Sequence, residues 1–259
     1  MAKKTFLITG ATSGLGAGTA LALAKAGHHV TVTGETWQQV REFRDVAEKA
    51  KTKLTVIKLD LLDDIDIAHA AQVDADVIVL NAGLQESGAI VDIPLERMRE
   101  SFEINVFGHL QLIQAIAPRL VAQKKGMFVW LSSIAGLQPV PFLGAYSATK
   151  HAIEGIAGAM KLELAPLGIK VATIAPGVFG TGFNDTGAES MHQWHDPKTA
   201  LVPVPPMGPL LAHQADPQEM IDAIVDTLTS SKPPYRTMRP EATAKAAKAA
   251  QAEQWVAKA

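Results

Sequence analysis

The sequence contains no cysteine, almost no net charge and no long apolar run, and each absence excludes a class of protein. Without cysteine there is no disulfide, no thiol nucleophile and no cysteine-ligated zinc or iron-sulfur centre. A formal net charge of −2, with lysine and arginine spread along 259 residues, gives no basic surface to attract nucleic acid or an anionic membrane. No stretch approaches the ~18 apolar residues of a membrane span, and the apolar run near the N-terminus is too short for a signal peptide. We therefore expect a cytoplasmic protein that binds neither nucleic acid nor membrane.

Short apolar runs alternate with longer helical patterns along the chain. The runs cover residues 5–9, 30–33, 54–59, 76–80, 127–132 and 170–175, and several are apolar at nearly every position. Strands that helices cover on both faces have this composition, because neither face meets water. Helical patterns fall near residues 14–26, 36–50, 96–123 and 145–166. This order predicts an α/β fold of the Rossmann type, a doubly wound parallel sheet in a single domain of residues 1–259.

The regular alternation breaks after the sixth predicted strand. Residues 179–215 contain several prolines and no long periodic helix, which is typical of a lid over a substrate. Asp216 then predicts a helix N-cap, with Pro217 at the first helical position. The alanine-rich tail, residues 241–259, predicts a solvated helix anchored by Trp255, with an oligomer contact as the alternative.

Three glycines, Gly10, Gly14 and Gly16, follow the first strand directly in the segment LITGATSGLGAGTA. Such glycines permit a tight turn and let a diphosphate approach the backbone, while free N–H groups at the helix N-terminus bind the anion. Glycine-rich turns are common, so the motif alone is weak, but the strand before it and the helix after it supply the context of a nucleotide site. Further site residues should gather at the carboxyl ends of the other strands. The residues there are Asp60, the segment NAG (Asn81, Ala82 and Gly83), Ser132, Ser133, Pro176 and Gly177.

Tyr146 and Lys150 are four residues apart and share one face of a predicted helix. A neighbouring ammonium favours the phenolate and lowers the pKa of a tyrosine toward the working range of an acid-base catalyst. An isolated pair of this kind is more often an ordinary pair on a helix surface. Ser133 changes that balance, because it ends the preceding strand and its hydroxyl could bind the same substrate oxygen.

With these motifs in order, residues 4–182 resemble the short-chain dehydrogenase/reductase family. The matching segments are TGATSGLG, NAG, the asparagine of FEINVFG, the serine before the helix, YSATK and PGVFGT. The resemblance implies hydride transfer between a nicotinamide cofactor and an alcohol or carbonyl carbon, with Tyr146 as general acid or base and Ser133 polarising the oxygen. It further implies that Lys150 lowers the pKa of Tyr146 and binds the nicotinamide ribose, and that Asn105 holds a water linking Lys150 to solvent.

The resemblance also implies a set of cofactor-binding residues, in which Thr181 would meet the nicotinamide carboxamide. The expected set is Gly10, Thr12, Ser13, Gly14, Leu15, Gly16, Glu35, Asp60, Leu61, Asn81, Ala82, Gly83, Tyr146, Lys150, Pro176, Gly177, Val178 and Thr181.

Glu35 follows the second strand, where the family's residues meet the adenosine ribose. A carboxylate accepts hydrogen bonds from a free ribose diol and repels a 2′-phosphate. NADP users of the family often carry arginine at this position, and NAD users usually carry aspartate one residue earlier, where this chain has Gly34. Neither pattern fits fully, and Glu35 could also be a solvated acid at a helix N-terminus. The charge predicts NAD in preference to NADP, with an NADPH-dependent carbonyl reductase as the alternative.

Apolar side chains dominate the predicted lid, which favours a medium-sized hydrophobic secondary alcohol or ketone as substrate, unless these side chains only pack the lid onto the domain. They are Phe179, Phe183, Met191, Trp194, Leu201, Val202, Val204 and Met207. The wording PFLGAYSATKHAIEG is similar to the hydroxysteroid and retinol dehydrogenase branches of the family, and the resemblance implies a homodimer or homotetramer.

His192 and His195 lack an obvious set of further ligands, so we expect no metal site. A non-catalytic nucleotide-binding protein is the alternative from another class, and the intact serine, tyrosine and lysine argue against it.

Overall fold

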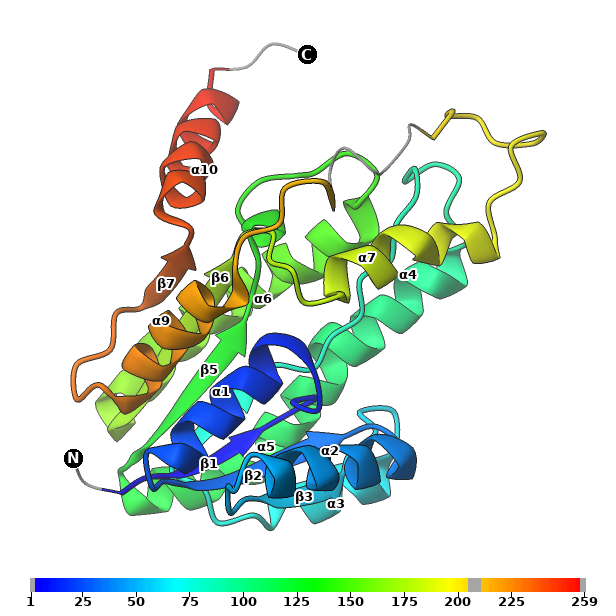
Figure 1. The fold of residues 1–259 in the computed structure, drawn as a ribbon. Coiled ribbons are helices and arrows are strands. Elements are labelled where there is room, and N and C mark those ends of the chain that lie inside the picture. The colour runs from blue at the N-terminus through cyan, green and yellow to red at the C-terminus, as the bar shows by residue number, and fades with distance from the viewer. Residues whose placement is uncertain (1–2, 205–210, 257–259) are drawn as a thin grey trace.

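The computed structural model describes residues 3–204 and 211–256, in which seven strands form one parallel sheet (Figure 1). The strands are β1 (Thr5–Ile8), β2 (His29–Gly34), β3 (Thr55–Lys58), β4 (Val77–Leu80), β5 (Gly126–Leu131), β6 (Ile169–Pro176) and β7 (Arg236–Arg239). Their order across the sheet is β3-β2-β1-β4-β5-β6-β7, and every pairing is parallel. The order reverses between β1 and β4, so the predicted doubly wound sheet is confirmed and its ligand crevice is expected at this reversal.

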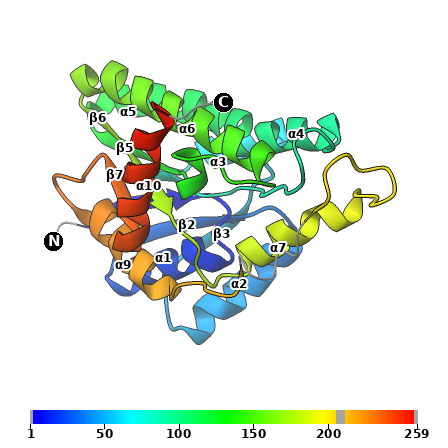
Figure 2. The ribbon, with the colours of Figure 1, turned by 90° about the horizontal axis from the view of Figure 1, so that it is seen from above.

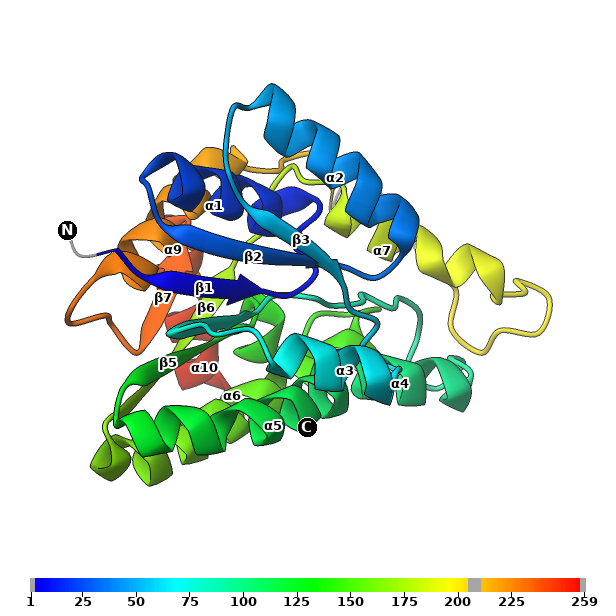
Figure 3. The same cartoon turned by 90° about the horizontal axis from the view of Figure 1, so that it is seen from below.

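Helices cover both faces of the sheet, as Figures 2 and 3 show from two opposite sides. The long helices are α1 (Gly14–Lys25), α2 (Trp37–Lys49), α3 (Asp64–Ala71), α4 (Leu95–Phe102), α5 (Gly108–Gln123), α6 (Gly144–Leu164), α7 (Phe183–Glu189), α9 (Pro217–Thr229) and α10 (Glu241–Gln254). Helices α1, α2 and α9 lie on one face, and α3, α5 and α6 lie on the other. In residues 3–204 and 211–256, every helix is too short or too polar to span a lipid bilayer.

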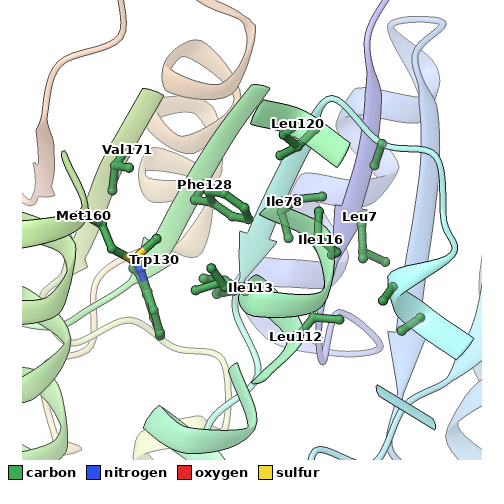
Figure 4. Packing of buried hydrophobic residues seen from close by; sticks show 14 of the residues in the cluster. Leu7, Ile78, Leu112, Ile113, Ile116, Leu120, Phe128, Trp130, Met160 and Val171 are labelled. Carbon is green, nitrogen blue, oxygen red and sulfur yellow. The ribbon is translucent and has the colours of Figure 1, made fainter. Parts of the chain in front are cut away.

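Side chains from the two faces of the sheet form two separate hydrophobic cores. Phe6 and Ile8 of β1 pack with α1, α2 and α9, whereas Leu7 packs with α3, α5 and α6. Figure 4 shows the second core, in which Phe128 and Trp130 of β5 are fully buried against α5 and α6. Because side chains alternate along a strand, both faces of a central strand must be apolar, and this explains the continuous apolar runs in the sequence.

The predicted start of α9 agrees with the structure, and two other predicted segments are more divided than expected. The N-cap of α9 is Asp216, whose carboxylate accepts a hydrogen bond from the Gln218 N–H at 2.9 Å, and Pro217 is the first helical residue. The predicted helix 96–123 is interrupted, because a π-helix, Glu103–Phe107, separates α4 from α5. The described residues of the predicted irregular segment 179–215 include α7 and a 3₁₀ turn, Ser190–Gln193.

Two elements and one anchor differ from the sequence prediction. Strand β7 and helix α3 were not expected, because three of the four residues of RTMR are polar and prolines flank it, and because DIDIAHAA is short and begins with acids. The tail forms α10, but the expectation that Trp255 anchors it is wrong, since that side chain is 90% exposed. Ala244 and Ala247 anchor the helix instead, by packing in a small apolar cluster with Leu137, Ala175 and Met238.

Candidate active site

A cavity of about 570 Å³ opens at the carboxyl ends of the central strands. Its lining comes from the loops that follow β1, β4, β5 and β6 and from the start of α6 and α7. The lining residues are Gly10, Ser13, Gly14, Leu15, Gly16, Gln39, Asn81, Gly83, Leu84, Gln85, Leu131, Ser132, Ser133, Tyr146, Lys150, Pro176, Gly177, Phe179, Thr181, Gly182, Phe183, Asn184, Thr186 and Gly187.

The glycine loop forms a cradle that side chains would fill. Gly10 has φ +57, and a Cβ there would lie 2.7 Å from the Cα of Ala82. A Cβ at Gly16 would lie 2.5 Å from the Nδ2 of Asn81. Ser13, the N-cap of α1, forms no side-chain capping hydrogen bond, so the first N–H groups of the helix stay available for an anion. The loop therefore fits the diphosphate of a dinucleotide.

Hydrogen bonds tie the ends of β1 and β4 together beneath this loop. The Asn81 Nδ2 donates to the carbonyl oxygens of Thr9 and Gly10, at 2.8 and 3.0 Å. The Thr9 Oγ1 accepts from the backbone N–H groups of Asn81 and Ala82, at 2.9 and 3.0 Å. The asparagine of the NAG motif is thus a scaffold residue that fixes the shape of the glycine loop.

His109 extends this network to the helix that carries Asn105. Its Nδ1 lies 3.2 Å from the backbone carbonyl oxygen of Asn105, and its Nε2 lies 3.0 Å from the Thr9 Oγ1. A carbonyl oxygen can only accept, so Nδ1 carries the proton and the Thr9 hydroxyl donates to Nε2. Burial lowers the pKa of His109 to about 4, which keeps the imidazole neutral at pH 7.

Asn105 lies in the π-helix, where its side chain is fully buried. The Oδ1 accepts from the Leu84 N–H at 2.7 Å, and the Nδ2 donates to the Leu84 carbonyl oxygen at 2.8 Å and to the Thr149 Oγ1 at 3.0 Å. A Cβ at Gly83 would lie 3.3 Å from the Asn105 Oδ1 and 3.8 Å from the Lys150 Nζ. Asn105 thus joins the NAG loop to α6, and its role in holding a water stays a prediction.

Ser133, Tyr146 and Lys150 all line the cavity, although they come from separate parts of the chain. The Ser133 Oγ accepts from the Ala135 N–H at 3.1 Å, which fixes its rotamer at the end of β5. Lys150 is 3% exposed and its Nζ donates to the Leu131 carbonyl oxygen at 2.7 Å. The same Nζ lies 5.4 Å from the centroid of the Tyr146 ring.

Burial dominates the electrostatics of this group. It raises the pKa of the Tyr146 hydroxyl above its ordinary value, while the hydrogen bond of Ser133 acts in the opposite direction. Burial also lowers the pKa of Lys150 to about 8, against the charge of Glu154, which raises it. For Tyr146, desolvation is the larger of the two effects, so the net shift of its pKa is upward. The lowering of this pKa by Lys150 stays a prediction.

Glu35 lies outside the cavity lining and its side chain is exposed. The neighbouring side chain that does line the cavity is Gln39. Its Oε1 accepts from the Glu35 N–H at 2.7 Å and, in the capping box of α2, from the Thr36 N–H at 3.4 Å. Gly34 packs tightly, since a Cβ there would lie 3.0 Å from the Cγ2 of Thr12. An aspartate at position 34 would therefore have little room in this chain.

The cavity brings together most of the residues expected from the sequence. Those that line it are Gly10, Ser13, Gly14, Leu15, Gly16, Asn81, Gly83, Ser133, Tyr146, Lys150, Pro176, Gly177 and Thr181. Those that lie outside its lining are Thr12, Glu35, Asp60, Leu61, Ala82, Asn105 and Val178. Asp60 has an oxygen already engaged, because its Oδ1 accepts from the Leu62 N–H at 2.9 Å.

Some of the apolar residues expected in the lid line the cavity, and others lie outside its lining. Phe179 and Phe183 line the cavity, and the Phe183 ring lies 6.1 Å from that of Tyr146. Met191 is 1% exposed and packs inside the molecule, whereas Leu201 is 76% exposed, so the packing alternative holds for part of the segment. Met207 lies outside the described residues.

Sequence reasoning missed several lining residues, of which Gln39, Gln85, Asn184 and Thr186 carry polar side chains. The one sequence signal for Gln85 is its position two residues after the NAG motif. His192 is exposed, and residues 3–204 and 211–256 contain no group of three or more histidine, cysteine or acidic residues arranged to hold a metal ion.

A parallel sheet whose glycine loop, serine, tyrosine and lysine meet in one cavity defines a nucleotide-dependent oxidoreductase. The family model described as short chain dehydrogenase matches residues 4–191. The chain belongs to the short-chain dehydrogenase family, and it is a nicotinamide-dependent dehydrogenase or reductase.

Among the relatives of this chain are two that match about nine tenths of its length. An uncharacterized oxidoreductase of Bacillus subtilis is 31% identical over 88% of this chain and 86% of its own length. Human retinol dehydrogenase 8 is 30% identical over 91% of this chain and 81% of its own length.

Solved structures share the fold. A short-chain dehydrogenase from Streptomyces avermitilis has a TM-score of 0.81 and 27% identity, covering 98% of this chain and 94% of its own. A short-chain dehydrogenase/reductase from Burkholderia phymatum in complex with NAD has a TM-score of 0.81 and 17% identity, covering 98% and 95%. One from Sphingobium yanoikuyae in complex with NADPH has a TM-score of 0.75 and 23% identity, covering 99% and 96%.

Proposed function

We propose that this enzyme interconverts a hydrophobic secondary alcohol and its ketone, with Tyr146 as the general acid or base and NAD as the preferred cofactor. The observation that carries the proposal is the meeting of Ser133, Tyr146 and Lys150 in a cavity that the glycine loop also lines. A bound nicotinamide supplies or accepts the hydride. The residues of this chain then have to orient the substrate oxygen and move one proton.

In ketone reduction, the Tyr146 hydroxyl is the proton donor. This hydroxyl donates to the carbonyl oxygen as that oxygen gains negative charge, and Ser133 donates a second hydrogen bond to the same atom. In the reverse direction the Tyr146 phenolate takes the proton from the alcohol. Lys150, with a pKa of about 8, is mainly cationic at neutral pH and stabilises that phenolate.

The cofactor would lie across the cavity from the glycine loop to the end of β6. The cradle at Gly10 and Gly16, with the free N–H groups of α1, suits the diphosphate. Thr181 would meet the carboxamide, and Lys150 would bind the nicotinamide ribose. These assignments rest on the resemblance of the motifs and on the lining of the cavity.

NAD is proposed over NADP because of Glu35. The carboxylate follows β2 directly and is exposed, so it is free to accept hydrogen bonds from a ribose diol and to repel a 2′-phosphate. The tight packing of Gly34 is consistent with an acid one residue later than is usual in the family. Structural neighbours of this chain have been solved with NAD and with NADPH, so the preference must be measured on this protein.

The substrate is proposed to be hydrophobic because the cavity lining includes Leu84, Phe179 and Phe183, and the Phe183 ring lies 6.1 Å from that of Tyr146. The name of one relative, retinol dehydrogenase 8, also indicates a hydrophobic alcohol as substrate. We further propose that residues 179–215 act as a substrate lid, and that the enzyme is a cytoplasmic homodimer or homotetramer.

A substrate screen tests this function directly. Secondary alcohols are assayed with NAD or NADP, and ketones with NADH or NADPH, by the absorbance of the reduced cofactor. We expect turnover of apolar cyclic or aromatic substrates, with higher kcat/KM for NAD or NADH. Turnover confined to small charged substrates would contradict the substrate class. Equal or better use of the phosphorylated cofactors would contradict the preference and favour an NADPH-dependent carbonyl reductase.

A further inference from the structure

Gln85 presents a buried side-chain amide to the cavity. The residue is 6% exposed, and it lines the cavity next to Leu84. The hydrogen bonds in this segment belong to its neighbours, and among the residues that the structure describes the Gln85 amide has no partner. The polar atoms of the amide stay accessible from the cavity, so a ligand that displaces water there must replace its hydrogen bonds or leave the amide unsatisfied.

The backbone on both sides of Gln85 is held in place by buried polar contacts. Before it, the N–H and carbonyl groups of Leu84 are both bonded to the side chain of Asn105. After it, the Glu86 carboxylate accepts from the Trp194 Nε1 at 3.0 Å, and the Ser87 N–H donates to the Ser190 Oγ at 2.9 Å. Residues of the lid thus clamp the segment, and the direction of the Gln85 side chain is fixed before a substrate enters.

The lid also makes room for this side chain. A Cβ at Gly187 in α7 would lie 2.4 Å from the Gln85 Nε2 and 2.6 Å from its Cδ. Only a glycine lets the amide lie against α7 in its present position, because any larger residue would push it aside. The amide is therefore built into the cavity wall from two sides, by the loop after β4 and by the lid.

We propose that Gln85 is a polar subsite that hydrogen-bonds a second, neutral oxygen function of the substrate, a hydroxyl or a carbonyl, remote from the reacting carbon. An amide can donate to such a group and accept from it, and it carries no charge. In the part of the chain that the structure describes, Lys150 is the only charged side chain of the lining. A charged substrate group would lack a counter-ion beside Gln85, whereas a neutral oxygen group is matched by it.

The inference rests on the proposed alcohol and ketone chemistry and names a feature of the substrate. The enzyme would act on a hydrophobic skeleton that carries two oxygen functions. One reacts at Tyr146, and the other is recognised at Gln85. The second contact would discriminate against substrates that lack this oxygen, because their binding leaves the amide unsatisfied.

The test uses three pairs of ketones that differ by one hydroxyl group. The pairs are decalone and hydroxydecalone, cyclohexyl phenyl ketone and its ring-hydroxylated analogue, and androstanone and hydroxyandrostanone. The wild type is compared with Gln85→Met, which keeps the length of the side chain and removes its hydrogen bonding. Gln114→Met is the matched control, because it makes the same change at an exposed residue of α5 outside the cavity lining.

We expect the wild type to prefer the hydroxylated member of at least one pair. Gln85→Met should lower kcat/KM for that member about tenfold, the loss expected for one buried hydrogen bond, and leave the parent ketone and the cofactor KM unchanged. Gln114→Met should behave as the wild type.

Two results would overturn the inference while the proposed function stands. The first is a wild type without preference in any pair. The second is a Gln85→Met variant that loses activity equally on both members or raises the cofactor KM. A wild type that turns over none of the six ketones would instead contradict the proposed function itself.

Discussion

The Nζ of Lys150 lies 5.4 Å from the centroid of the Tyr146 ring and hydrogen-bonds the Leu131 carbonyl oxygen. The two residues are one helical turn apart on α6, so the helix alone sets their spacing. The carbonyl at the end of β5 then directs the ammonium into the cavity. This arrangement places a buried cation, with a pKa of about 8, beside a tyrosine whose own pKa is raised by burial.

Removing that cation should change the pH profile as well as the rate. Lys150→Met is expected to lower kcat about 100-fold or more and to raise the cofactor KM, because one ammonium serves both proton transfer and ribose binding. In the wild type, kcat/KM for ketone reduction should fall as the pH rises above about 8, where the ammonium loses its proton. The variant should lack this fall. A variant that keeps the same inflection would show that another group titrates there.

Glu35 is expected to select the cofactor through its charge. Glu35→Arg should raise the ratio of kcat/KM for NADP to kcat/KM for NAD tenfold or more, since the guanidinium attracts the 2′-phosphate that the carboxylate repels. Glu42→Arg, the same change at an exposed acid of α2, is the control and should leave the ratio unchanged. If both variants shift the ratio equally, the overall charge of the surface, and not a contact of residue 35, decides between NAD and NADP.

Acid should destabilise the protein through His109. The folded state keeps this imidazole neutral down to about pH 4, whereas an unfolded histidine takes up a proton near pH 6.5. The unfolded state therefore binds more protons in this window, and the stability that the neutral His109 allows at pH 7 is lost as the pH falls from 6.5 toward 4. The loss should reach on the order of 3 kcal/mol at the lower end.

Urea denaturation of His109→Gln and the wild type at pH 7 and pH 4.5 measures this effect. The variant should lose less unfolding free energy between the two pH values than the wild type does. His151→Gln on an exposed face of α6 controls for the loss of one histidine. Equal losses in His109→Gln and the wild type would contradict the neutral, buried imidazole.

The glycine loop should not tolerate a methyl group. In Gly16→Ala the new Cβ would lie 2.5 Å from the Asn81 Nδ2 and 2.9 Å from the Ala11 Cα, so the variant should lose about 1–3 kcal/mol of stability and bind cofactor more weakly. Gly155→Ala is the control, because a Cβ there meets nothing within 4 Å and alanine favours the helix. Isothermal titration with NAD and urea denaturation measure both effects. Unchanged cofactor affinity in Gly16→Ala would contradict the cradle.

The sequence predicted those features that are determined by residues close to one another along the chain. Continuous apolar runs identified the buried strands, and the spacing of Tyr146 and Lys150 identified one face of a helix. Strand β7 was missed because its pairing with β6 stabilises it, whereas three of its own four residues are polar. Gln85 was missed because its significance depends on Gly187, which lies about a hundred residues away in the sequence and against it in space.

The burial of individual side chains also could not be predicted from the sequence. The composition of the tail suggested Trp255 as an anchor, but the helix buries small alanines and leaves the large indole in solvent. Likewise, the motifs identified Tyr146 without indicating that burial would raise its pKa.

The most direct test of the account is the activity of Tyr146→Phe on a substrate that the wild type turns over, together with its affinity for NAD. The substitution keeps the ring and its packing against Phe183 and removes only the hydroxyl. We predict that kcat falls by a factor of about 1,000 or more, the size expected when a general acid or base is lost, while the Kd for NAD stays within about twofold. A Tyr146→Phe enzyme that retains most of its kcat would contradict the assignment of the proton transfer to this residue.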